Sequence, residues 1–284
     1  MTDLAALLPR IERLLDRLQP PDTTSGLDWK KVRAARWAAQ AGVLKPILHP
    51  QRVALADLLE IDDQKRRVDA NTRQFVAGRP ANNVLLTGAR GSGKSSLVKA
   101  IHAKYAPKGL RLIEVDKAGL GSLPDLFDLL AEADHRFIIF IDDLSFAEHE
   151  PGYASLKAAL DGSLAGPSDN VLIYATSNRR HLMPEYMADN LSTQYLGGEV
   201  QPGEAIEEKV SLSDRFGLWV SFHSMDQDTY LAIARHWANA LRAPLDDSFE
   251  RAALQWSQGR GARNGRVAWQ FARDWAGRSR PGKR

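Results

Sequence analysis

One octapeptide, residues 88–95 (Gly-Ala-Arg-Gly-Ser-Gly-Lys-Ser), constrains the fold of this 284-residue chain more than any other stretch. It fits G-x-x-x-x-G-K-[ST], in which glycines let the backbone curl so that successive N–H groups point at a polyanion. An apolar run, residues 83–87, precedes it, and apolar side chains at helical spacing follow it through residue 105. Strand, glycine loop and helix in this order predict a nucleotide phosphate site at the end of a buried strand.

Each residue type in the loop has a chemical reason. We expect Lys94 to reach the β- and γ-phosphates of a nucleotide and the Ser95 hydroxyl to bind Mg²⁺. The residues predicted to hold the phosphates are Gly88, Ala89, Arg90, Gly91, Ser92, Gly93, Lys94, Ser95 and Ser96. The alternative is a glycine-rich turn without a ligand, and the flanking strand and helix patterns argue against it.

A second stretch, residues 137–143 (Phe-Ile-Ile-Phe-Ile-Asp-Asp), has the pattern of a fully buried strand that ends in two acids. Asp142 is predicted to hold the Mg²⁺ shell, as the acid that closes this strand does in P-loop ATPases. Asp143 stands where many of them have a glutamate that polarises the attacking water, and its shorter side chain predicts slow hydrolysis. The alternative is a strand end capped by two solvated acids.

Three further side chains are candidates for the same site. Asn178 follows an apolar run, residues 171–175, and its amide can orient a water between nucleophile and phosphate. Arg215 precedes the last apolar run, residues 218–222. Arg263 and Arg266 are three residues apart at the start of a helical pattern, so they share one face. In isolation, a turn-forming asparagine and surface arginines would explain these residues equally well.

Short apolar runs alternate with amphipathic segments through the middle of the chain, which is typical of a parallel sheet covered by helices. The runs predicted as strands are 84–87, 111–115, 137–141, 171–175 and 218–222. After residue 225 only helical patterns remain, at 227–241, 246–258 and 262–276.

The N-terminal part carries helical periodicity. Residues 4–18 have leucine and isoleucine at amphipathic spacing, and the pattern stops at Pro20. Residues 27–41 are predicted as a second helix that interleaves Trp29 and Trp37 with basic side chains. This second helix is interpreted as a solvated face with two half-buried indoles; the alternative is a basic, aromatic surface for nucleic acid.

Composition excludes several chemistries. The chain has no cysteine, which removes disulfides, thiolate zinc sites and cysteine nucleophiles. No apolar run is long enough to span a membrane and no secretory pattern opens the sequence, so a cytoplasmic location without membrane contact is expected. The net charge is +3, with basic ends and an acidic stretch over residues 181–223. This asymmetry suits either nucleic acid or contacts between subunits.

Taken in order, the phosphate loop, the strand that ends in Asp142 and Asp143, Asn178, Arg215 and the helical C-terminal unit resemble the AAA+ ATPases. More closely, residues 80–86, 142–146, 174–182 and 211–218 are similar to an uncharacterised bacterial AAA-type ATP-binding family catalogued as a domain of unknown function. The Asp-Asp-Leu-x-Phe and Arg-Phe-Gly phrases also resemble the bacterial replication initiator, an ATP-dependent switch on DNA.

The resemblance implies roles by position. Asn178 would be the first sensor, Arg263 the second sensor on the lid, and Arg215 the finger that reaches a neighbouring subunit's γ-phosphate. Arg266 is an alternative to Arg263. Arg179 and Arg180 are alternatives to Arg215.

The resemblance also implies an architecture, a three-layer α/β P-loop NTPase (AAA+) with a parallel five-stranded sheet. Its expected parts are an N-terminal helical extension (1–50), an AAA+ α/β nucleotide-binding domain (51–224), a helical lid (225–277) and a basic tail (278–284).

The function implied is an ATPase that uses ATP and Mg²⁺, forms a homo-oligomer in ATP, and slowly hydrolyses ATP to ADP and phosphate to remodel or load a protein or nucleoprotein partner. The alternative is a nucleotide-gated binding module, an initiator- or loader-like switch with incidental hydrolysis and DNA as a candidate partner.

Overall fold

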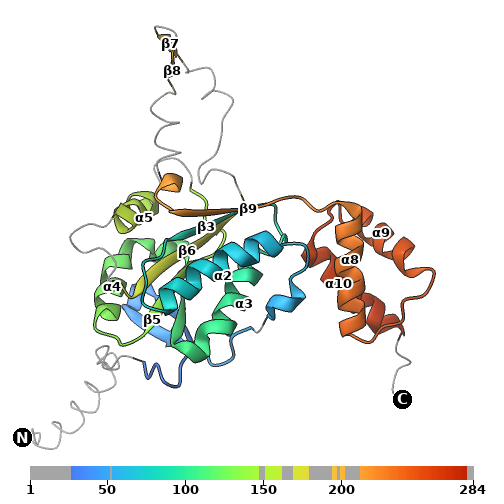
Figure 1. The fold of residues 1–284 in the computed structure, drawn as a ribbon, viewed down its shortest axis with the longest axis horizontal. Coiled ribbons are helices and arrows are strands. Elements are labelled where there is room, and N and C mark those ends of the chain that lie inside the picture. The colour runs from blue at the N-terminus through green and yellow to red at the C-terminus, as the bar shows by residue number, and fades with distance from the viewer. Residues whose placement is uncertain are drawn as a thin grey trace, which may run out of the picture.

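A computed structural model shows an α/β unit, in which one sheet lies between two layers of helices, followed by a separate group of helices (Figure 1). The residues that the structure describes are 27–51, 53–146, 151–161, 169–178, 194–196, 199–201 and 212–279. The predicted helix over residues 4–18 and the alternatives Arg179 and Arg180 lie outside these residues.

The central sheet has seven strands in the order β2-β1-β4-β5-β6-β3-β9. These strands are β1 Ala34–Ala38, β2 Val43–Pro46, β3 Val84–Gly88, β4 Leu110–Glu114, β5 Arg136–Ile141, β6 Val171–Ser177 and β9 Leu218–Phe222. All neighbours pair in parallel except β1 and β2, which are antiparallel. A two-stranded ribbon, β7 Gln194–Leu196 and β8 Glu199–Gln201, stands apart from it. Below, the carboxyl edge is where β3, β5 and β6 end, and the amino edge is where they begin.

The prediction of a five-stranded sheet is therefore wrong by two strands. The five predicted strands all form, but β1 and β2 add to the β4 side of the sheet. The predicted helix over residues 27–41 is wrong for the same reason, because Ala34–Ala38 pairs with β4 instead of coiling. Residue 50 consequently does not separate a helical extension from the sheet in the described part of the chain.

The basic, aromatic surface weighed for nucleic acid is also ruled out by this pairing. Trp29 and Trp37 are buried in the hydrophobic core, with exposed fractions of 9% and 2%. The Trp37 indole donates a 2.7 Å hydrogen bond to Ser122 Oγ, and Trp29 packs edge-on against Phe137. Two buried indoles leave no aromatic platform for bases to stack on.

Helices cover both faces of the sheet. On one face lie α2 Asp62–Val76 and α3 Lys94–Tyr105, and on the other α4 Leu123–Ala131 and α5 Pro151–Asp161 (Figure 1). Short 3₁₀ turns are η1 Ala39–Ala41, η2 Leu55–Asp57, η3 Ala106–Lys108 and η4 Lys117–Ser122. Alternate strand residues supply the two cores: Ile139 faces α4 and α5, whereas Ile138 faces α3. This division explains why the predicted strands read as unbroken apolar runs.

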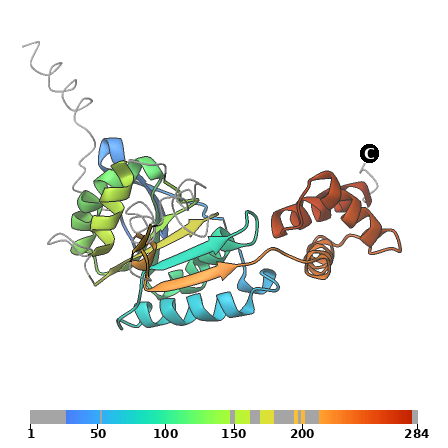
Figure 2. The same ribbon diagram turned by 90° about the horizontal axis from the view of Figure 1, so that it is seen from above.

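The lid consists of the three predicted C-terminal helices, α8 Gln227–Ala240, α9 Phe249–Gly259 and α10 Gly265–Ser279. It has its own hydrophobic core, which includes Tyr230 and Phe249, and it lies to one side of the sheet in both views (Figures 1 and 2). Polar contacts between described residues join it to the α/β unit: the Gly265 N–H donates to Gly91 O at 3.0 Å, and His236 Nε2 lies 3.2 Å from Asp57 Oδ1.

Candidate nucleotide site

The loop between β3 and α3 has a backbone that only glycine adopts easily. Gly88, Gly91 and Gly93 have φ values of +130°, +76° and +105°. A Cβ on Gly88 would lie 1.9 Å from Phe222 O, and one on Gly91 would lie 2.6 Å from the Asn264 side-chain oxygen. Glycine is therefore required both by conformation and by the close approach of β9 and of the lid.

Lys94 folds back over this loop and is nearly buried. Its ammonium donates to Gly88 O at 2.7 Å, to Ala89 O at 2.8 Å and to Asn178 Oδ1 at 3.0 Å. Burial lowers the pKa of Lys94, although the charges of Asp142 and Asp143 oppose that shift. A desolvated ammonium held by neutral oxygens is poised for an anion, because an anion would offset the cost of burying its charge.

Asp142 ends β5 beside two hydroxyl groups. Ser95 Oγ and Thr176 Oγ1 each donate a 2.6 Å hydrogen bond to Asp142 Oδ1. Ser95 comes from the first turn of α3 and Thr176 from β6, so three elements meet at one carboxylate oxygen. Hydroxyl and carboxylate oxygens are the ligand types that Mg²⁺ takes in phosphate sites.

Asp143 has an unusual backbone, and each of its carboxylate oxygens faces a donor group. Its φ is +55°, in the left-handed region, and its N–H donates to Thr176 Oγ1 at 2.9 Å. Asn178 Nδ2 donates to Asp143 Oδ1, while Arg90 Nη2 lies 3.6 Å from Oδ2. The Asn178 amide thus bridges Lys94 and Asp143, and its orientation is fixed by a donor on one side and an acceptor on the other.

The residues present fit a nucleotide with a divalent cation. Ser92 Oγ, in the middle of the loop, is buried and has no hydrogen-bond partner, which is what a missing ligand leaves behind. Within the described ranges, no group of three or more His, Asp or Glu side chains could hold a metal alone. A cation at Ser95 and Asp142 would therefore complete its shell with phosphate oxygens and water.

Arg215 is not brought to this cluster. It lies at the amino edge, where the Leu218 N–H donates to Asn83 O and where a Cβ on Gly217 would meet Asn82. Its guanidinium forms an ion pair with Asp161 at the end of α5. It also lines a cavity of about 520 Å³ with Arg79, Arg136, Asp169 and Asp214. The five residues of β3 separate this edge from the phosphate loop by roughly 16 Å.

From the lid, Arg266 contributes to lowering the pKa of Lys94, as does Arg90 from the loop. Arg263 and Arg266 are both exposed. The sequence analysis did not identify Thr176, the Arg90–Asp143 contact or Asn264, because each depends on which segments adjoin in space.

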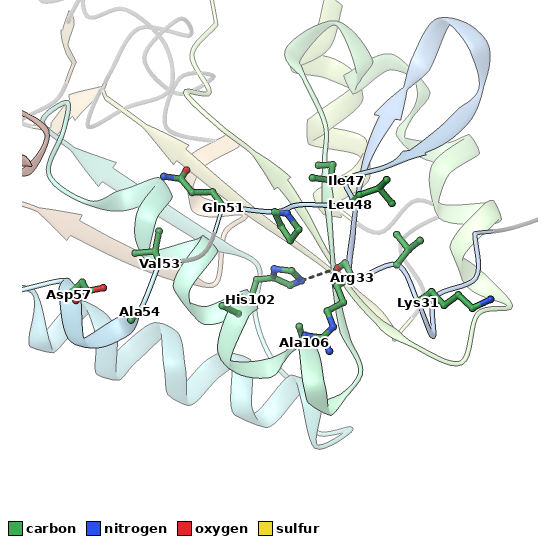
Figure 3. A pocket seen from close by; sticks show the side chains of 13 residues that line it. Lys31, Arg33, Ile47, Leu48, Gln51, Val53, Ala54, Asp57, His102 and Ala106 are labelled. Atoms are coloured by element: carbon green, nitrogen blue, oxygen red, sulfur yellow. Dashed lines mark hydrogen bonds between the residues drawn. The ribbon is translucent and has the colours of Figure 1, made fainter. Parts of the chain in front are cut away.

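A larger cavity, of about 680 Å³, lies between the C-terminal end of α3 and residues of the 31–57 segment, and no residue of the phosphate loop lines it (Figure 3). Lys31, Arg33, Leu48 and Asp57 contribute to its wall, and His102 points into it from α3. His102 Nε2 donates to Arg33 O at 2.9 Å. Burial, reinforced by the charges of Arg111 and Arg33, lowers the pKa of His102 to about 4.

The strand order β4-β5-β6-β3-β9, the glycine loop after β3, the acids after β5 and the helical lid define the chain as a P-loop protein of the AAA+ class. More particularly, the chain belongs to the family described as protein of unknown function DUF815, which matches residues 30–279. The predicted resemblance to an AAA-type domain of unknown function is thereby confirmed.

Solved structures share the fold at low identity. The Orc1 protein of Aeropyrum pernix, solved in complex with DNA, matches with a TM-score of 0.54 and 17% identity over 79% of this chain and 62% of that chain. A variant of RuvB from Thermotoga maritima matches with a TM-score of 0.52 and 15% identity, over 78% and 64%. This chain spans less than two thirds of either one. No curated protein matches it at a significant level, and no helix in its described part has the length and apolarity of a membrane span.

Proposed function

We propose that this protein binds ATP with Mg²⁺ and slowly hydrolyses it to ADP and phosphate. The observation that carries the proposal is the grouping of Lys94, Ser95 and Asp142 at the carboxyl edge, next to a loop with three glycines at positive φ. Ligands of open α/β sheets bind at this edge, where helix dipoles favour an anion.

Each side chain has a distinct part in the proposed reaction. Lys94 stabilises the terminal phosphates, Ser95 and Asp142 hold the cation, and Asp143 accepts the proton of the attacking water. Asn178 orients that water through its amide, whose two ends already contact Lys94 and Asp143. Arg266, with Arg263 as the alternative, adds positive charge from the lid.

We further propose that the active species is an oligomer, because Arg215 stands at the opposite edge from its own phosphate loop. A guanidinium there is out of reach of its own phosphate loop, so a part in phosphoryl transfer requires the site of a neighbouring copy. Such a contact would exchange Asp161 for the neighbour's γ-phosphate and stabilise the charge that develops in phosphoryl transfer.

A second candidate function is a nucleotide-gated switch whose assembly, rather than turnover, carries the activity. The contacts of Asp143 favour it, since a carboxylate that already accepts from Asn178 and faces Arg90 has less freedom to turn toward an attacking water. The client is a protein or nucleoprotein in either case. The DNA in the Orc1 structure makes DNA a reasonable first candidate to test, in a cytoplasmic setting.

Calorimetry with MgATP and a phosphate-release assay on wild type and Asp143→Asn test the proposal. We expect both proteins to bind MgATP and only wild type to release phosphate above background. Wild type that binds no MgATP would overturn the proposal. Equal phosphate release from both would assign the base to another residue. Proteins retained by Asp143→Asn only in ATP would identify the client.

A further inference from the structure

Arg90 occupies a place in the phosphate loop from which it can contact either of two anions. Its side chain is 76% exposed, and Nη2 lies 3.6 Å from Asp143 Oδ2, too far for a direct hydrogen bond. An exposed ion pair of this length contributes little free energy and exchanges readily. Arg90 also lies close enough to Lys94 to affect its pKa, so it belongs to the electrostatic surroundings of the terminal phosphates.

Asp143 is held from two sides by groups that belong to the phosphate site. Asn178 donates to one carboxylate oxygen, and Arg90 faces the other. Lys94, Asn178, Asp143 and Arg90 thus form a chain of contacts in which each charged group faces a partner within the protein. A polyphosphate that binds here must compete with Asn178 for Lys94 and with Asp143 for Arg90.

We propose that Arg90 distinguishes a bound triphosphate from a diphosphate by exchanging its contact with Asp143 for the terminal phosphate, which frees the Asp143 carboxylate. This inference rests on the proposed ATP binding. A guanidinium prefers phosphate because it can donate two parallel hydrogen bonds to a doubly charged group, and at 3.6 Å it donates none to Asp143. A diphosphate lacks the group for which Arg90 would leave, so Asp143 stays paired.

The exchange makes Arg90 a specificity-determining residue and a positioning residue for the base. In wild type, the Asp143 carboxylate is released from Arg90 only when a triphosphate is present, so it turns to the attacking water only in the ATP-bound site. The short reach of Asp143 makes this dependence stronger, since a carboxylate that is held toward Arg90 is less able to turn toward the water.

Calorimetry of wild type and Arg90→Gln with MgADP and with the non-hydrolysable β,γ-imido analogue of MgATP tests the proposal without relying on turnover. Arg90→Gln removes the charge from an exposed side chain, so the fold should persist. We expect the triphosphate analogue to bind at least about tenfold more weakly, the lower end for a hydrogen bond to a charged group. The affinity for MgADP should fall less than about threefold, the effect of one screened surface charge. Arg90→Lys, which keeps the charge, should recover part of the preference.

A double-mutant cycle with Asp143→Asn separates exchange from simple attraction. Asp143→Asn should increase the affinity for the triphosphate analogue when Arg90 is present. The increase should be clearly smaller in the Arg90→Gln background, because that background has no Arg90–Asp143 pair to break. Arg266→Gln is the matched control: it removes a charge that also acts on Lys94 but does not face Asp143, so the increase should stay the same.

Two results would overturn the inference and leave the proposed function standing. One is an equal gain in analogue affinity from Asp143→Asn with Arg90 and with Arg90→Gln. The other is an unchanged ratio of analogue to ADP affinity in Arg90→Gln. Wild type that binds neither nucleotide would overturn both.

Discussion

The carboxyl edge of the sheet carries two hydrogen-bonded pairs, Lys94 with Asn178 and Ser95 with Asp142, whereas the amino edge carries Arg215 beside Arg79 and Arg136. At the first edge, cations and anions are paired across three elements that end together. At the second, the arginines line an open cavity, and Arg215 is paired with Asp161 from the end of α5.

Under the proposed function, one copy of the chain would hold two incomplete halves of a phosphoryl-transfer site. The phosphate loop has cations and acids, with Arg215 at the opposite edge. The amino edge has the arginine without a phosphate loop. Four predictions test this division, from the largest expected effect to the smallest.

Lys94→Ala should reduce MgATP affinity below detection, a loss of about 10³-fold or more, because it removes the one buried ammonium at the loop. Lys99→Ala is the matched control: Lys99 lies on the same helix but donates to Gln51, away from the loop. Calorimetry measures both. Unchanged affinity in Lys94→Ala would contradict the assignment of the carboxyl edge as the nucleotide site.

Arg215→Ala should bind MgATP normally yet lose about 10³-fold or more in turnover, as related phosphoryl-transfer systems do without their arginine. Mixing it with Lys94→Ala should restore part of the activity, since each supplies the half that the other lacks. Phosphate release from the mixture is the measurement. A protein that stays monomeric in ATP by light scattering, with turnover independent of concentration, would favour a single-subunit switch.

His102, on the helix that begins with Lys94, should make folding stability depend on pH. Its pKa is lowered to about 4 from the model-peptide value of 6.5, so the unfolded state binds the proton more tightly. The contribution of His102 to the free energy of unfolding is therefore fully present above pH 6.5 and is lost as the pH drops toward 4. The loss is about 2 kcal/mol between pH 7 and 5.

Urea unfolding of wild type and His102→Gln at several pH values measures this effect. Glutamine can still donate to Arg33 O but does not titrate, so its stability should change less over the same interval. Parallel curves for the two proteins would show that His102 is not the group responsible.

Asn264→Ala should have the smallest effect, about 1 kcal/mol of stability, because its Oδ1 caps α10 by accepting from the Val267 N–H at 2.9 Å. The same side chain lies against Gly91, so nucleotide affinity should also fall severalfold. Asp226→Ala removes an equivalent cap from α8, which lies in the same lid away from the loop. A comparable loss of affinity in Asp226→Ala would mean that lid stability in general, not the contact with Gly91, matters.

The sequence by itself determined the elements whose information is local. A glycine loop between a strand and a helix, five apolar runs and three amphipathic helices could be predicted because turn chemistry and periodicity are read over a few residues. The order of Lys94, Ser95, Asp142 and Asn178 along these elements also placed them at one edge, since parallel strands end together.

Only the tertiary structure decided the rest. The alanine-rich segment at 34–38 has helical propensity, but pairing with β4 and burial of Trp37 outweigh it, and no local pattern encodes that partner. The contacts of Arg90 with Asp143, of Thr176 with Asp142 and of Asn264 with Gly91 join residues 34 to 173 positions apart. The separation of Arg215 from Lys94 has the same origin, because a sheet sends the two ends of its strands to opposite edges whatever the sequence between them.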